Sequence, residues 1–231
     1  LLLFAVLAAA PLWVPARAQS EDSEAAYRRG IAAAQVHDAS TAMAAFTTAA
    51  AAGHAAAVNA IGMMLMGDQG VPTDRDAARG WFERSAAMGY APAAFNLANI
   101  YGQGRGVPRD YARAMHWLLQ AAEGRHAPAA FSIGAMHLRG LGVPADEATA
   151  LGWYRRAAEQ GFPPAEDAVG LALERQGNRA GAEEWYRRAA GHDFAIAQVR
   201  LGDLLSRAPS TPAGDAEALT LFRRAAAAGF A

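Results

Sequence analysis

The chain has 231 residues and contains neither cysteine nor lysine. Without cysteine it can form no disulfide, no thiolate zinc site and no lipid-modified cysteine after a leader segment. Its 21 basic residues, all arginine, are balanced by 22 acidic residues, and the formal net charge is −1. A chain so close to neutrality shows no electrostatic signature of a polyanion, and we expect no nucleic-acid partner.

The chain also lacks the short motifs of common enzymes and cofactor sites. None of the six histidines stands at a metal-ligand spacing from another, and there is no G-x-S-x-G sequence. The alternating glycines Gly102, Gly104 and Gly106 follow no strand pattern and precede no G-K-[ST], so they predict a turn rather than a phosphate site. We expect no catalytic residue, no metal and no cofactor.

What the chain does contain is an internal repeat. Trp81, Trp117 and Trp153 are 36 residues apart, and Trp185 follows after 32. Two alanine columns keep the same register: Ala42, Ala78, Ala114, Ala150, Ala182 and Ala218, and then Ala50, Ala86, Ala122, Ala158, Ala190 and Ala226. A period of this length indicates stacked supersecondary units that bury their apolar faces against one another.

Each full unit reads as two helices joined by a glycine-rich turn. In the third unit, apolar residues recur at helical intervals over 92–101 and again over 110–123. Asp110 stands where the second helix needs an N-cap. The second helices end near a glycine, but in the third unit Arg125 replaces it, and we expect an irregular loop there. The last helix is predicted at 215–228.

Large residues and glycines in fixed columns have a packing role. We expect Trp81, Trp117, Trp153, Trp185 and Tyr101 to fill gaps between units, while Gly106 and Gly142 make turns. On this interpretation Trp117→Ala removes a large buried ring and costs about 3–5 kcal/mol.

The pattern from Ala94 to Asp110, followed by Ala114, Trp117 and Ala121-Ala122, resembles the Sel1-like repeat, a relative of the tetratricopeptide repeat. The resemblance covers nearly all of the chain from residue 25 onward. It implies an all-α, right-handed α-solenoid superhelix of about six helix-turn-helix repeats, whose members commonly scaffold protein complexes, including bacterial envelope and signalling complexes. The expected units are 25–53, 54–90, 91–126, 127–162, 163–194 and 195–231.

A different segment precedes the array. Residues 1–14 are almost entirely apolar, and Ala16-Arg17-Ala18 follows as a cleavage pattern. We interpret residues 1–18 as a signal peptide and 19–24 as a polar lead-in, because the apolar stretch is short for a span of about 20 residues. An uncleaved membrane anchor is the alternative. We therefore expect a periplasmic or secreted protein that touches a membrane only through an uncleaved segment or a partner.

Candidate binding residues follow if the units curve as tetratricopeptide arrays do, with the first helix of each on the concave side. Positions two before and two after the Leu97 column then form an inner strip, with Ala135, Leu171 and Val199 among them. The partner-binding candidates on this strip are Asn59, Met63, Phe95, Asn99, Phe131, Asp167 and Asp203. Such a strip suits a peptide with one or two apolar anchors. For Phe95 and Phe131, packing between units is an equal alternative, whereas packing alone does not call for Asn99.

Doubled arginines form a second candidate surface at 155–156, 187–188 and 223–224. They could dock an acidic partner, or they could solvate a helix face and pair with acids such as Glu159 or Glu184.

The function predicted from these patterns is a non-catalytic adaptor of the bacterial cell envelope that binds a peptide or protein partner on its concave face. Two alternatives stay open. One is an envelope enzyme that hydrolyses peptidoglycan or a β-lactam, an activity linked to some Sel1-like proteins. The other is a regulatory inhibitor of a membrane signalling or export complex.

Overall fold

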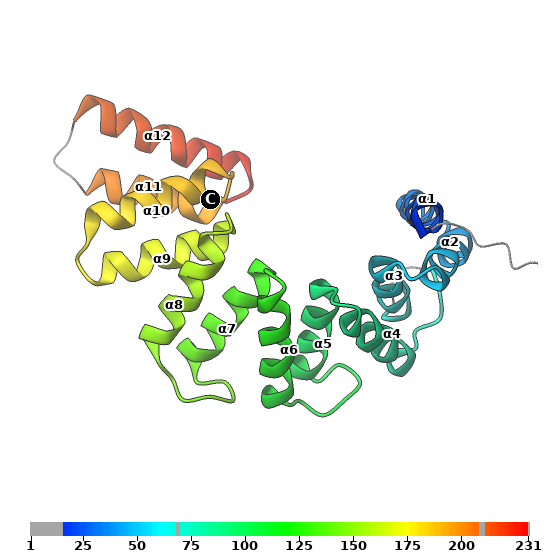
Figure 1. Cartoon of the computed structure of the whole chain (residues 1–231). Helices are drawn as coiled ribbons and strands as arrows, with labels where there is room; N and C mark the ends of the chain where they lie inside the picture. The colour runs from blue at the N-terminus through cyan, green and yellow to red at the C-terminus, as the bar shows by residue number, and fades with distance from the viewer. Residues whose placement is uncertain (1–15, 68–69, 208–210, 231) are drawn as a thin grey trace, which may run out of the picture. The chain divides into compact units, whose positions relative to one another are not determined.

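The computed structural model describes residues 16–67, 70–207 and 211–230, with side chains from residue 22 onward, and this part of the chain is helical without any strand (Figure 1). In chain order the helices are α1 (Ala16–Gln35), α2 (Ala39–Ala51), α3 (Ala55–Leu65), α4 (Arg75–Ala87), α5 (Ala91–Gln103), α6 (Tyr111–Glu123), α7 (Ala127–Arg139), α8 (Glu147–Ala158), α9 (Pro163–Arg175), α10 (Arg179–Gly191), α11 (Ala195–Ser206) and α12 (Pro212–Ala227). The all-α prediction is confirmed.

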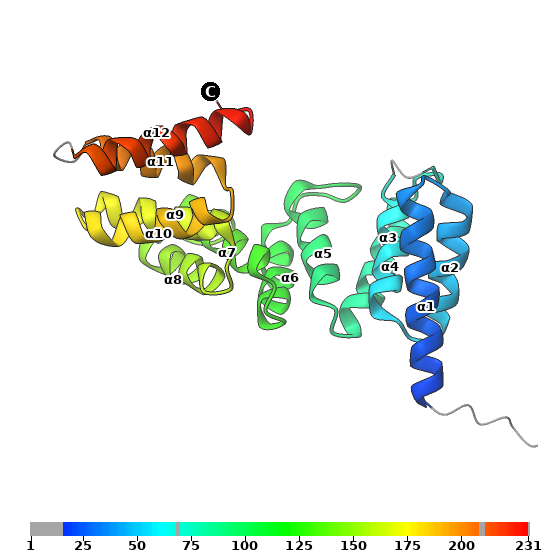
Figure 2. The same ribbon diagram turned by 90° about the horizontal axis from the view of Figure 1, so that it is seen from above.

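The helices pack as consecutive pairs within two compact units, Leu1–Met88 and Gly89–Ala231. The first unit holds α1 to α4, and the second holds α5 to α12. Each odd-numbered helix packs most closely on the helix that follows it, and within a unit each pair then packs on the next (Figures 1 and 2). The chain is therefore an α-solenoid of helix-turn-helix repeats, as predicted.

The helix ends follow the local chemistry that the sequence indicates. Asp110 caps α6 by accepting a hydrogen bond from the backbone N–H of Arg113 at 2.9 Å, and Asp74 and Asp146 cap α4 and α8 in the same way. The final helix begins earlier than predicted, because Thr211 caps it and Pro212 occupies its first position.

The loops after the second helices need a left-handed residue. Glycine takes this conformation at 53, 89 and 161, with φ of 84°, 82° and 74°. Arg125 takes the same conformation after α6 with φ of 58°, and the His126 N–H donates to the Ala121 carbonyl as the His54 N–H does to that of Ala49, so the predicted irregularity of this loop is wrong. Gly106 and Gly142 also have positive φ, 81° and 72°, as their predicted turns require.

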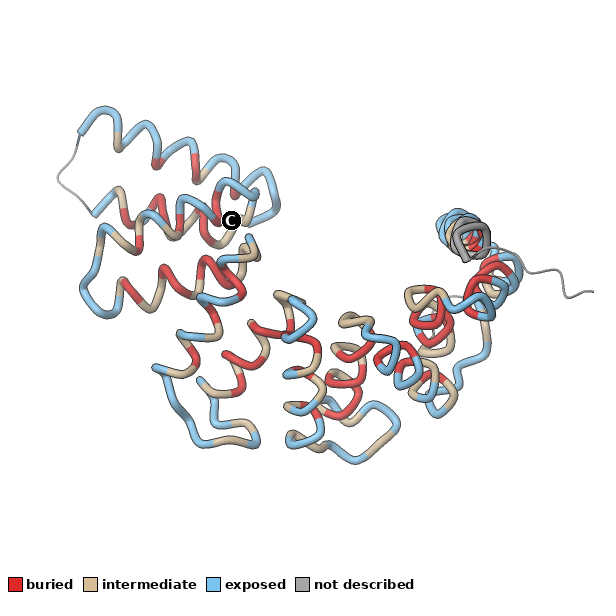
Figure 3. Tube along the Cα trace, viewed as in Figure 1, coloured by how far each residue is buried: buried red, intermediate tan, exposed pale blue. Residues whose placement is uncertain are grey.

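In five of the six repeats a glycine on the first helix faces an aromatic ring on the second. A Cβ atom placed on Gly62 would lie 2.7 Å from the ring of Phe82, and the same distance separates Gly134 from Tyr154. Gly170 and Tyr186 repeat this arrangement, as do Gly202 and Phe222. Figure 3 shows the resulting buried positions along the facing sides of the paired helices. Close contact between the two helices therefore depends on the missing side chain.

The tryptophans lie beside this core rather than in it. Trp81, Trp117, Trp153 and Trp185 are all only partly buried, whereas the residue after each of them is buried. The prediction of a large buried ring at Trp117 is wrong. Leu118 faces the core, and Trp117, the residue before it, points about 100° away around the helix axis. Tyr101, in contrast, is only 7% exposed, as its packing role requires.

At least one arginine of each doublet contacts other groups of the array. Arg156 stacks over Trp153 at 5.1 Å and donates a hydrogen bond to the Ala122 carbonyl of the preceding repeat at 3.2 Å. Arg188 does the same with Trp185 at 4.1 Å and the Ala158 carbonyl at 3.4 Å. Of the two interpretations of the doublets, these contacts favour pairing within the protein over docking of an acidic partner.

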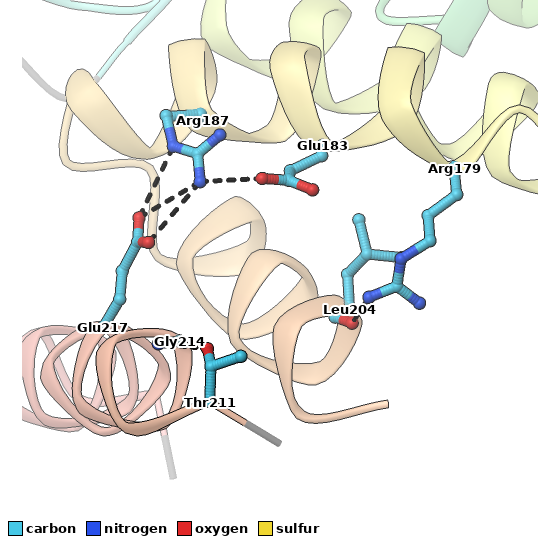
Figure 4. A network of polar contacts seen from close by, with 7 residues as sticks. All are labelled: Arg179, Glu183, Arg187, Leu204, Thr211, Gly214 and Glu217. Carbon is cyan, nitrogen blue, oxygen red and sulfur yellow. Dashed lines mark hydrogen bonds and ion pairs between the residues drawn. The ribbon is translucent and has the colours of Figure 1, made fainter. Parts of the chain in front are cut away.

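The acidic partners of the doublets differ from the predicted ones. Arg188 pairs with buried Glu166 at 3.2 Å. Arg187 pairs with Glu183 on its own helix at 2.9 Å and with Glu217 on α12 at 3.3 Å (Figure 4). Within the described residues, neither Glu159 nor Glu184 forms an ion pair with an arginine of the doublets. In the same region Arg179 donates a hydrogen bond to the Leu204 carbonyl, which connects α10 to α11 (Figure 4).

The structure describes only part of the segment to which the N-terminal predictions apply. Residues 1–15, most of the predicted signal peptide, lie outside the described residues, and α1 includes both the cleavage pattern and the polar lead-in 19–24. Glu24 fixes this helix to the next repeat through His54, whose Nε2 lies 3.1 Å from its carboxylate. None of the helices that the structure describes is long and apolar enough to cross a membrane.

Candidate binding site in the second unit

A pocket of about 450 Å³ opens in the second unit between α7, α8, α9 and α11. Three of these are the first helices of consecutive repeats, and α8 is the second helix of the repeat that α7 begins. The pocket is therefore built by three adjacent repeats, and no single repeat contains it.

The walls of the pocket are mostly apolar. Phe131 and Leu138 come from α7, Leu151 and Tyr154 from α8, and Leu171 from α9. The Phe131 ring packs against buried Tyr154 with 5.2 Å between ring centroids. Burial raises the pKa of the Tyr154 phenol. Such a wall can take up a large apolar side chain.

One buried ion pair lies in this apolar lining. Asp167 on α9 accepts a hydrogen bond from Arg200 on α11, and its side chain is only 9% exposed. Burial raises the pKa of the Asp167 carboxyl, and Arg200 opposes that shift. Its second oxygen, Oδ1, has no hydrogen-bond partner among the described residues. The pair thus places two opposite charges in the lining of the pocket.

Two further arginines stand at the edge of the pocket. Arg139 is the last residue of α7 and Arg175 the last of α9, and both side chains are exposed. Neither guanidinium forms a hydrogen bond or an ion pair with another residue that the structure describes. The pocket also has one exposed acid, Glu147, at the start of α8.

A second hollow continues the first along α9 and α11. The two share Leu171, Arg175 and Arg200, and the second adds Glu174, Asp203 and Arg207. Glu174 accepts a hydrogen bond from the Tyr186 hydroxyl at 2.9 Å and pairs with Arg207 at 3.3 Å. An apolar pocket thus borders a polar one, as a peptide with apolar and polar side chains would require.

The structure brings part of the predicted inner strip together. Phe131, Asp167 and Leu171 line the first pocket, and Asp203 lines the second. Phe131 also contacts Phe162, the N-cap residue of α9, with 5.6 Å between ring centroids, so packing and lining are both roles of this ring.

Other members of the strip lie outside both hollows. Phe95 and Asn99 are partly buried on α5, and Phe95 packs against the His126 ring at 4.8 Å. In the first unit Asn59 is buried and donates a hydrogen bond to the sulfur of Met63 at 3.5 Å, while Met63 is 46% exposed. A binding role for these four residues stays a prediction.

The arginines of the site were not among the predicted residues. Arg139, Arg175 and Arg207 hold the same position in three successive repeats, 36 and 32 residues apart. The recurring arginine could have been found from the sequence by this spacing. It was missed because the inner strip was defined by other repeat positions. Within the described residues no group of three or more histidines, aspartates or glutamates is arranged to hold a metal ion.

Comparison with protein families gives a consistent match. The model of the Sel1 repeat matches residues 55–90, 91–126, 127–162, 169–193 and 195–230, which together make up well over half of the chain. These segments correspond to the second to sixth predicted units, and the helix pair α1–α2 lies before them. No curated protein matches the chain significantly.

Solved structures show the same architecture. A Sel1 repeat protein from Oxalobacter formigenes is 24% identical, with a TM-score of 0.78 over 89% of this chain and 88% of that one. The protective antigen c5321 from uropathogenic Escherichia coli, which displays an SLR fold, is 27% identical with a TM-score of 0.73. That match covers 93% of this chain but 46% of c5321. The immunity protein PA5088 from Pseudomonas aeruginosa is 16% identical, with a TM-score of 0.60 over 93% of this chain and 86% of its own.

Proposed function

Because the chain belongs to the Sel1 repeat family, we propose that it is a non-catalytic adaptor that binds a segment of a partner protein in the pocket between Phe131 and Asp167. Sel1 repeat proteins generally mediate protein–protein interactions, and the family is typically non-catalytic. The partner is a peptide or an exposed protein segment, and the binding surface is the row formed by the first helices of the second unit.

The observation that carries this proposal is the pocket itself. Its volume of about 450 Å³ lies within the range of sites that hold small ligands or one or two large side chains. Apolar walls with a few fixed polar groups are typical of the anchor pockets that dominate peptide affinity. Since the lining comes from three repeats, stacking of the repeats preorganises the site and lowers the entropy cost of binding.

We place the adaptor in the bacterial cell envelope, as a periplasmic or secreted protein. Support for this comes from the apolar segment 1–14 and the cleavage pattern Ala16-Arg17-Ala18. Expression with export and mass determination of the N-terminus would test it, with Gln19 as the expected first residue. A chain that keeps residues 1–18 and stays in the membrane fraction would support the anchor instead.

Photocrosslinking tests the position of the binding surface. A benzophenone amino acid at position 171 should crosslink a partner in an envelope extract, because Leu171 lines both hollows. The same group at position 155 is the control, since Arg155 is exposed on α8 and lines neither of these hollows. Crosslinks from position 155 alone would contradict the proposed surface.

A further inference from the structure

The last turns of three first helices carry arginine in the same repeat position. Arg139 ends α7, Arg175 ends α9 and Arg207 directly follows α11, and each borders one of the two hollows. Basic residues are favoured at helix C-termini by the helix dipole, but α5 ends in Gln103 at this position. The fold therefore does not require arginine there.

The arginines around the hollows divide into paired and unpaired groups. Arg200 is held by Asp167 and Arg207 by Glu174. Arg139 and Arg175 are exposed and form no hydrogen bond or ion pair with any described residue. They stand on adjacent repeats at the edge of the apolar pocket, so a ligand can use both without breaking an existing contact.

We propose that the segment bound in this pocket is acidic: one bulky apolar side chain enters between Phe131, Leu151 and Leu171, and carboxylate side chains beside it pair with Arg139 and Arg175. This inference rests on the proposed adaptor function and specifies the chemistry of its ligand. Guanidinium groups bind carboxylates through two parallel hydrogen bonds, which a lysine or an amide cannot reproduce. Exposed charges at the rim of an apolar pocket select between partners more than they add affinity.

Two acids lie near the same surface and define the limits of this preference. Asp203 lines the second hollow together with Leu171 and Arg175, and Glu147 borders the apolar pocket from the start of α8. The apolar pocket thus has two unpaired cations and one unpaired anion. A glutamate in the ligand is attracted by Arg139 and Arg175 and weakly repelled by Glu147.

Binding of defined peptides to the full chain tests the proposal. The probes are nine-residue fluorescent peptides with acetylated and amidated ends, a central leucine or phenylalanine, and flanks of glutamate, glutamine or lysine. Blocked ends exclude recognition of a terminal carboxylate. We expect glutamate-flanked peptides to bind on the order of tenfold more tightly than glutamine-flanked ones, and the difference to shrink at high salt.

Charge variants identify the groups responsible. The double variant Arg139→Gln/Arg175→Gln should remove most of the tenfold preference and leave the glutamine-flanked peptides unaffected. Glu147→Gln should strengthen the glutamate-flanked peptides by about two- to threefold. Arg155→Gln removes one positive charge at an exposed position of α8 that lines neither hollow and should alter no affinity.

The outcomes separate this inference from the proposed function. If all flanks bind alike and Leu171→Ser abolishes binding, the adaptor pocket stands and the acidic preference is wrong. If acidic peptides bind equally well to Leu171→Ser, or oligo(dT) competes with them, the surface attracts any polyanion and the inference fails. If no peptide binds at millimolar concentration, both proposals fail.

Discussion

A single pair of positions, one on each helix, controls how closely the two helices of a repeat approach. Four repeats combine glycine with an aromatic ring at 2.7 Å from the hypothetical Cβ, as at Gly170 and Tyr186. The third repeat has Ala98 and Leu118 at the same two positions. A larger residue on one helix thus goes with a narrower one on the other, so total volume is conserved.

Substitution of Gly170 by alanine should destabilise the protein by about 1–3 kcal/mol, because the new methyl group overlaps the Tyr186 ring. Gly152 provides the matched control, since it lies exposed on α8 and a methyl group added there would have no neighbouring atom within 4 Å. Gly152→Ala should stabilise by about 0.5–1 kcal/mol through helix propensity. Urea denaturation measures both, and equal changes would contradict the proposed role of Gly170.

The left-handed conformation of Arg125 gives a second prediction. Arg125→Gly should raise the free energy of unfolding by about 0.5–1 kcal/mol, because glycine adopts φ of 58° without steric strain. The reverse change at the equivalent loop, Gly161→Ala, should lower it by about 1 kcal/mol. Thermal unfolding compares the two variants. Stabilisation by Gly161→Ala would contradict the left-handed conformation of this loop position.

The sequence predicts which columns recur but not which of two neighbouring columns faces the core. Tryptophan and the residue after it share one period and are both large, so periodicity alone cannot separate them. A helix turns by about 100° from one residue to the next, and the packing of the paired helix decides between them. The glycine column was the missed signal, because a small residue indicates where a ring lies opposite.

Helices and their ends were the most predictable elements. Aspartate caps and glycine stops act locally, so Asp110 and Gly161 mark boundaries without knowledge of the fold. Part of the lining of the two hollows was predicted, since the inner strip included Phe131, Asp167 and Asp203. Arg139 and Arg175 were not predicted because they belong to the last turn of each helix, outside the columns that defined the strip. The residues of α8 that line the pocket were not predicted because their position depends on packing between repeats.

The ion pair between α9 and α11 makes helix packing depend on pH. Burial raises the pKa of Asp167 above its ordinary value, so its ionised form destabilises the fold as pH rises through that range. Arg200→Gln removes the opposing charge and raises this pKa further. The variant should lose more than about 1 kcal/mol at pH 7, but less than the loss of roughly 3–5 kcal/mol for a fully buried pair, because Arg200 is partly exposed.

The loss caused by Arg200→Gln should shrink towards pH 4, because the Asp167 carboxyl of the folded chain, whose pKa is raised, takes up a proton there and no longer needs the opposing charge of Arg200. Denaturation curves between pH 4 and pH 7 measure this. The double variant Asp167→Asn/Arg200→Gln lacks the titrating group and should show no such trend. A deficit that is constant with pH would mean that Arg200 acts only through packing.

In a repeat array, stability is the sum of local terms and nearest-neighbour contacts. Tyr186→Ala removes a ring with 0% exposure and its hydrogen bond to Glu174, and it should cost about 3–5 kcal/mol. We expect amide hydrogen exchange to accelerate in α9 to α12 and to stay unchanged in α1 to α4.

The neighbouring substitution Trp185→Ala is the control for Tyr186→Ala. Its indole is only partly buried, so it should have a clearly smaller effect on exchange in the same helices. Uniform acceleration throughout the chain by Tyr186→Ala would show that the array unfolds as one cooperative body instead of by neighbouring repeats.

The fit between glycine and ring also constrains how such a gene can be shuffled. Exchange of whole repeats keeps each small residue with its own bulky counterpart, whereas a crossover in the turn inside a repeat could join Ala98 to Tyr154 and force a methyl group into a ring. Engineered arrays that combine half of the third repeat with half of another should therefore be less stable than arrays joined between repeats.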